Sequence, residues 1–138
     1  MSYTTEIKKE ISSIISTKSE MIAELSGFIR NNGVIENNIL SLTTENEFTV
    51  ERLKNFFQNL YEVNLEIEVK DNVNFSKKKL YSLKLTTKTS LILKDVGYYD
   101  NTDNYLEVPP TYIVGANEEI RAYLRGVFLC TGSINNPK

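Results

Sequence analysis

Apolar residues recur every three or four positions in several segments of the chain. In the segment 49–61, for instance, the predicted buried stripe consists of Leu53, Phe56, Phe57 and Leu60. Residues at this spacing lie on one face of a helix, so each such segment predicts an amphipathic helix. The predicted helices span residues 4–16, 18–31, 49–61, 88–96 and 118–131.

Between these helices, other segments predict strands. Val34-Ile35 and Asn38–Thr44 read as a strand pair joined by a turn at Asn37-Asn38. Val63–Lys70 alternates apolar and polar residues, and Leu80–Thr86 does the same, with Tyr81, Leu83 and Leu85 pointing inward. Such alternation is typical of strands with one buried face. The order helix, two strands, helix, two strands, helix predicts an α+β fold, followed by an irregular stretch from Gly97 to Pro110.

One segment of the chain occurs twice. Residues 20–37 read EMIAELSGFIRNNGVIEN, and residues 119–136 read EIRAYLRGVFLCTGSINN. At an offset of 99, seven positions are identical: Glu20/Glu119, Ala23/Ala122, Leu25/Leu124, Gly27/Gly126, Gly33/Gly132, Ile35/Ile134 and Asn37/Asn136. A repeat at one fixed register predicts two copies of a structural unit.

The repeated small residues predict a close contact between two helices. Ala23 and Gly27 lie four residues apart on one helix face, and Ala122 and Gly126 do the same in the second copy. Small side chains at this spacing allow two helix backbones to approach closely. We call this predicted contact the helix seam.

The ends of the two repeated helices also carry signals. Thr17 and Glu20 have the spacing of a capping box, and Asn117 precedes two acids at the start of the second helix. Gly33 and Gly132 follow the two helices, where glycine commonly adopts a left-handed conformation that ends the helix.

The pattern L-x-G-x-x-x-x-x-G at the end of a helix, here Leu25 to Gly33, resembles the LAGLIDADG motif of homing endonucleases. The resemblance implies an αββαββα unit in which the residue before the last glycine is an acid that binds the catalytic metal. Asn32 and Thr131 occupy those positions here. Magnesium prefers carboxylate ligands, and Arg30 adds a nearby cation. We therefore expect no catalysis, no metal and no cofactor.

A longer resemblance covers essentially the whole chain. The ending RGVFLCTGSINNPK is similar to the pattern R-G-x-F-L-x-x-G-S-[IV]-x-x-P of the WhiA family, and SYTTEIKKEI and KKKLYSLKL also resemble that family. WhiA proteins are bacterial regulators of sporulation and cell division, with a degenerate LAGLIDADG domain followed by a helix-turn-helix domain. The resemblance implies an N-terminal helix at 1–17, a first unit at 18–115, and the start of a truncated second unit at 116–138. The helix-turn-helix domain is then absent.

Composition narrows the possible functions. The 138 residues suffice for one domain, contain no histidine and include one cysteine. The lack of histidine removes most Ser-His and Cys-His nucleophiles and most zinc sites. No apolar run is long enough to span a membrane, and the start has no signal-peptide core. These features predict a cytoplasmic protein, and the family resemblance implies association with the nucleoid in the full-length protein.

The charge of −2 argues against strong DNA binding by this chain alone. The candidate DNA contacts are Lys70, Lys77, Lys78, Lys79 and Lys84. LAGLIDADG proteins bind DNA on the open face of the sheet, where Glu66 and Glu68 would repel phosphates. The alternative is a solvated hairpin turn with incidental lysines.

Three further features have structural interpretations that we favour. Asp100–Asn104 is superficially similar to a calcium loop but lacks the required glycine and glutamate, so an ordinary polar loop is expected. Tyr98, Tyr99, Tyr105 and Tyr112 either stack on bases or cover an edge of the core. Cys130 is expected to be a buried thiol.

The leading hypothesis is a non-catalytic domain of a WhiA-like transcriptional regulator, acting as a scaffold, an interaction surface or an auxiliary DNA contact. One alternative is a protein-interaction module with no role in nucleic-acid binding. The other is a LAGLIDADG homing endonuclease, against which the missing acids argue.

Overall fold

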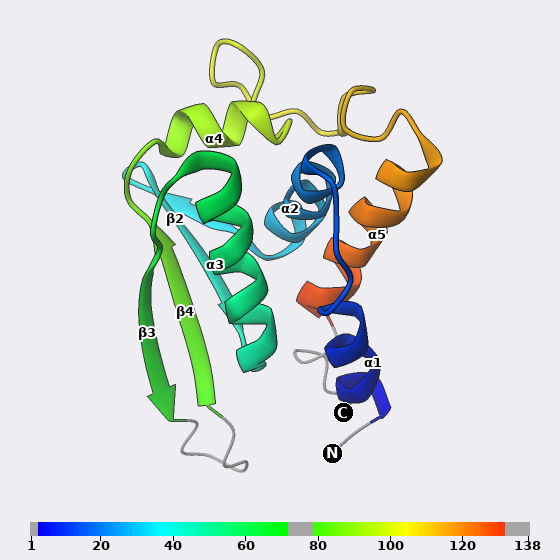
Figure 1. The fold of residues 1–138 in the computed structure, drawn as a ribbon. Coiled ribbons are helices and arrows are strands. Elements are labelled where there is room, and N and C mark those ends of the chain that lie inside the picture. Colours follow the sequence, from blue (N-terminus) through cyan, green and yellow to red (C-terminus); the bar gives the residue numbers. More distant parts are fainter. Residues whose placement is uncertain (1–2, 72–78, 132–138) are drawn as a thin grey trace.

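A computed structural model of the chain describes residues 3–71 and 79–131 (Figure 1). The described elements, in chain order, are α1 (Tyr3–Ile11), α2 (Lys18–Asn32), β1 (Val34–Glu36), β2 (Ile39–Thr44), α3 (Glu47–Tyr61), β3 (Glu66–Asp71), β4 (Lys79–Leu85), α4 (Thr89–Asp95) and α5 (Asn117–Thr131). From α2 to α4 this is the predicted αββαββα order. The α+β fold class is confirmed.

The four strands form one antiparallel sheet in the order β1-β2-β4-β3. Leu40 and Leu42 of β2 lie opposite Leu85 and Leu83 of β4, and all four are at most 1% exposed. Helix α3 contacts both strands and helix α2 contacts β2, so this face of the sheet carries the core. The turn between β1 and β2 uses Asn37 and Asn38 at φ of 53° and 61°, as predicted.

Helix α2 begins with the predicted capping box. The Thr17 hydroxyl accepts the Glu20 N–H, and the Glu20 carboxylate accepts the Thr17 N–H. The left-handed ending predicted at Gly33 is wrong, because its φ is −70° and its ψ is 141°. The chain passes directly into β1, and a Cβ at Gly33 would lie 2.9 Å from the Leu40 side chain. The glycine is needed for space. Gly132 lies outside the described residues.

The first helix is shorter than predicted. It ends at Ile11, and the hydroxyls of Ser12 and Ser13 bond to carbonyl oxygens of the last turn. Ile14 and Ile15, which fall within the helix predicted at 4–16, lie after the end of α1 and are 42% and 94% exposed. Serine hydroxyls compete for the backbone groups that a continuing helix would need.

The β3 strand differs from the prediction in where it begins and in how far its apolar side chains are buried. Val63 is 5% exposed but precedes the strand, which begins at Glu66. Ile67 and Val69 face the helix-covered side by register, yet they are 37% and 49% exposed. The lower end of the β3–β4 hairpin extends past the end of α3 (Figure 1), and β3 is an edge strand with a strand neighbour on one side only. The alternation of apolar and polar residues correctly predicted which face of the sheet Ile67 and Val69 lie on, but not how far they are buried.

Helix α5 begins at Asn117 itself, so the predicted capping role of Asn117 is wrong. The Glu119 carboxylate instead accepts a hydrogen bond from the Ala116 N–H at 3.2 Å. The described helices include none that is long and apolar enough to cross a membrane.

Candidate functional site

The two repeated helices, α2 and α5, pack directly on each other (Figure 1). A Cβ at Gly27 would overlap the Tyr123 carbonyl oxygen, and a Cβ at Gly126 would overlap the Glu24 carbonyl oxygen. These contacts are related by the repeat, since 27 + 99 = 126 and 24 + 99 = 123. Ala23 and Ala122 are both fully buried. The structure therefore brings together the four small residues of the helix seam. The two motif helices are related by a local pseudo-two-fold axis.

The two positions expected to hold catalytic acids lie at the ends of these helices. Asn32 is the last residue of α2, and its Oδ1 accepts a hydrogen bond from the Thr43 N–H at 2.8 Å. This contact fastens the end of α2 to strand β2. Thr131 is the last residue of α5, and its side chain lies outside the described part. No group of three or more Cys, Asp or Glu residues suited to a metal ion occurs within residues 3–71 and 79–131.

Arg30 has a role that the sequence did not indicate. Its guanidinium donates to the carbonyl oxygens of Leu106 and Gly97, both at 2.7 Å. It also lies 5.6 Å from the centre of the Tyr105 ring. Arg30 therefore fastens the loop after α4 to the end of α2.

A buried ionic network joins helices α2, α3 and α5. Glu24 is 3% exposed, and its carboxylate pairs with Arg52 of α3 at 2.6 Å and with Arg125 of α5 at 3.1 Å. Arg52 also donates to the carbonyl oxygens of Ser12 and Ile14, at 2.8 and 2.7 Å. Buried charges are tolerated when they are paired and hydrogen-bonded in this way.

Sequence reasoning missed this network. Glu24 sits inside the first motif between Ala23 and Leu25, and Arg125 sits inside the second, next to Gly126. A charged residue within a predicted buried helix face was the available signal. Its partner Arg52 comes from a helix 28 residues away in sequence, and spacing does not reveal such a pairing.

The sheet face opposite the helices is the candidate nucleic-acid surface. By register, its charged residues are Glu66, Glu68 and Lys70 of β3, Lys84 of β4 and Glu36 of β1. Within the described residues this face thus has three carboxylates and two ammonium groups. Its charge does not favour phosphate.

The structure separates the candidate lysines. Lys70 and Lys84 share the open face, whereas Lys79 lies opposite Asp71 and belongs by alternation to the other face. Lys77 and Lys78 lie outside the described residues. The described lysines therefore do not form one continuous cluster.

The loop after α4 is held by hydrogen bonds of its own. The Asp100 carboxylate accepts bonds from the N–H groups of Thr102 and Asn104, which lower its pKa. Tyr98 and Tyr99 pack against the core, as expected, while Tyr105 and Tyr112 are 52% and 60% exposed. The polar-loop interpretation fits this geometry, and the core-edge interpretation fits two of the four tyrosines.

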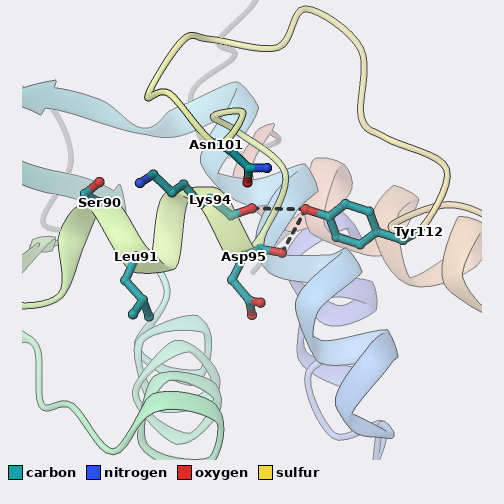
Figure 2. Close-up of a pocket in the computed structure, with 6 residues that line it drawn as sticks. All are labelled: Ser90, Leu91, Lys94, Asp95, Asn101 and Tyr112. Carbon is teal, nitrogen blue, oxygen red and sulfur yellow. Dashed lines mark hydrogen bonds between the residues drawn. The ribbon is translucent and has the colours of Figure 1, made fainter.

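A surface pocket lies on α4 (Figure 2). Its lining residues are Ser90, Leu91, Lys94, Asp95, Asn101 and Tyr112. The Tyr112 hydroxyl donates to the Lys94 carbonyl oxygen at 3.0 Å, and the Tyr61 hydroxyl donates to the Asp95 carboxylate at 2.6 Å. Burial, followed by this bond to Asp95, raises the pKa of Tyr61. These contacts join the loop to α4 and α4 to α3, a structural role.

Cys130 is buried, as expected, and its thiol lies 3.1 Å from the Val127 carbonyl oxygen. Burial raises the pKa of the Cys130 thiol to about 11. A thiol of this kind stays protonated near neutral pH and is a poor nucleophile.

Comparison with known proteins identifies related sequences. A sequence model described as the WhiA N-terminal LAGLIDADG-like domain matches residues 18–99. A protein of Lactiplantibacillus plantarum named "Probable cell division protein WhiA" is 34% identical over all of this chain and 46% of its own length. A protein of the same name from Listeria welshimeri is 33% identical, over all of this chain and 44% of its own length. The chain thus spans about half the length of the curated relatives it matches.

Solved structures support the same fold. The crystal structure of the N-terminal LAGLIDADG domain of DUF199/WhiA matches 94% of this chain and 58% of its own, with a TM-score of 0.66 and 22% identity. Full-length DUF199/WhiA from Thermatoga maritima matches 99% of this chain and 42% of its own, with a TM-score of 0.62 and 21% identity. The expected LAGLIDADG-like fold is confirmed.

Proposed function

The chain belongs to the WhiA family, and we propose that it is the non-catalytic scaffold part of a DNA-bound transcriptional regulator of cell division and sporulation. The observation that carries the proposal is the hydrogen bond from the Thr43 N–H to Asn32 Oδ1. LAGLIDADG nucleases have a metal-binding acid at this position. Here the neutral amide of Asn32 fastens the end of α2 to strand β2. We place the protein in the cytoplasm, with the full-length form on the nucleoid.

The absence of catalysis is tested with purified protein, plasmid DNA and magnesium. We expect no nicking and no micromolar magnesium binding by calorimetry, because neutral side chains give magnesium little reason to lose water. Asn32→Asp keeps an acceptor for the Thr43 N–H, whereas Asn32→Ala removes it. The alanine variant alone should therefore lose stability, by about 1 kcal/mol. Magnesium-dependent nicking by the parent protein contradicts the proposal.

Direct contact of this chain with DNA is proposed to be weak. Non-specific binders reach dissociation constants of about 10⁻⁴–10⁻⁶ M by neutralising several phosphates. With three carboxylates against two lysines on the described open face, we expect this chain at or beyond the weak end of that range. A salt titration by fluorescence anisotropy measures this.

Charge variants of the open face locate any contact that exists. Glu66→Gln combined with Glu68→Gln should strengthen binding, and Lys70→Ala combined with Lys84→Ala should weaken it and flatten the salt dependence. Lys79→Ala, on the other face, is the matched control for one lost lysine. Sub-micromolar sequence-specific binding by the unmodified chain at physiological salt would show that the sheet reads DNA itself.

The exposed face of α5 supports a second proposal, that it packs against a further structural unit. Leu124 is 57% exposed and Ile120 is 41% exposed, although their counterparts in the repeat, Leu25 and Met21, contact the core of the first unit. We propose that α5 is the motif helix of a second unit whose sheet covers this face.

If the chain is instead an interaction module unrelated to DNA, the salt titration shows no binding with or without the rest of a full-length protein.

A further inference from the structure

Strand β3 lies at an edge of the sheet, so one side of its backbone has no strand partner within residues 3–71 and 79–131. Its side chains alternate between two faces. Ile67 and Val69, on the helix side, are 37% and 49% exposed, and Glu66, Glu68 and Lys70 are exposed on the open face. An edge strand with half-exposed apolar residues is a template for the addition of another strand.

We propose that β3 pairs in antiparallel fashion with β3 of a second copy of this chain, around a two-fold axis at Val69. This register places Val69 opposite Val69 of the second copy. It also places Glu68 opposite Lys70 of the second copy, and Lys70 opposite Glu68 of the second copy. Cross-strand pairs of opposite charge stabilise a sheet, and a neighbouring strand would cover Val69. Two four-stranded sheets would become one continuous sheet.

The same charges disfavour the other symmetric arrangements. An axis at Glu68 places that carboxylate opposite its own copy, and an axis at Ile67 places Glu66 opposite Glu68. Parallel pairing in register sets every charged residue against the same charge. An axis between two residues would pair apolar with charged positions, because side chains alternate between the faces. Among these arrangements, the axis at Val69 is the one that opposes no like charges within residues 66–71, although it sets Ile67 opposite Asp71 of the second copy.

Sedimentation equilibrium from micromolar to millimolar protein tests the pairing. We expect a reversible dimer, which Glu68→Lys alone and Lys70→Glu alone each weaken by at least about five-fold, because each change creates two like-charge pairs. The double variant Glu68→Lys/Lys70→Glu should restore the dimer. Lys84→Glu makes the same charge change as Lys70→Glu on the inner strand β4, and should leave the dimer unchanged.

Every variant changes a surface position, and thermal unfolding followed by circular dichroism establishes that each one is folded. A parent protein that stays monomeric at millimolar concentration overturns the proposal. So does a dimer that the double variant fails to restore, since an axis at Glu68 would then leave like charges opposed. An effect of Lys84→Glu equal to that of Lys70→Glu would show that net charge, and not the β3 edge, controls association.

Discussion

A hydrogen atom in place of a side chain at Gly126 allows the two motif helices to pack. A Cβ there would overlap the Glu24 carbonyl oxygen, a backbone atom of α2 that cannot move without moving the helix. We expect Gly126→Ala to lower the free energy of unfolding by at least about 1–3 kcal/mol, as overpacking does, and Gly126→Leu by more. Urea denaturation followed by circular dichroism measures both changes. Arg121→Ala, exposed on the same helix, should stay within about 0.5 kcal/mol of the parent.

The Cys130 thiol makes stability depend on alkaline pH. Burial raises its pKa from 9.0 to about 11, so the folded state holds the proton more tightly than the unfolded state does. This contribution to stability is fully present below pH 9 and is lost as the pH rises towards 11. We expect denaturant midpoints to fall over that interval, and Cys130→Ala to fall less. An equal fall in both proteins would assign the loss to other groups.

At the scale of elements, the two repeated helices have the same sequence pattern and different surroundings. Leu25 of α2 is fully buried, and Leu124, its counterpart in α5, is 57% exposed. We expect Leu25→Ala to cost about 2–5 kcal/mol, and Leu124→Ala to remain within about 0.5 kcal/mol. Chemical denaturation of the two variants compares them directly. Equal losses would mean that another surface covers this face of α5 in solution.

At the scale of the whole molecule, Glu24 connects three helices and the segment before α2. Its carboxylate pairs with Arg52 and Arg125, and Arg52 in turn holds the carbonyl oxygens of Ser12 and Ile14. We expect Glu24→Gln to destabilise the fold by about 3–5 kcal/mol, because it leaves a buried arginine without its counter-ion. The measurement is urea denaturation. Breaking the exposed Lys54–Glu51 pair with Lys54→Ala is the control and should change little.

The amino-acid sequence by itself determined the element order, the α+β class, the capping box at Thr17 and the turn at Asn37-Asn38. These features depend on local spacing and on the conformations that single residues prefer, and both can be read along the chain. The repeat likewise predicted which small residues belong together. This contact could be predicted because both helices carry the same pattern of small residues on one face.

The tertiary structure alone decided the contacts between distant parts of the chain. It set Glu24 against Arg52, turned Arg30 to the loop at Gly97 and Leu106, and left Ile67 and Val69 half exposed. Asn32 stands where the motif would have a catalytic acid, and the tertiary structure shows that its side chain instead fastens α2 to the sheet. Periodicity fixes which side of an element a residue faces. What covers that side depends on how far the neighbouring elements reach and which side chains they bring, and this is known only when the chain has folded.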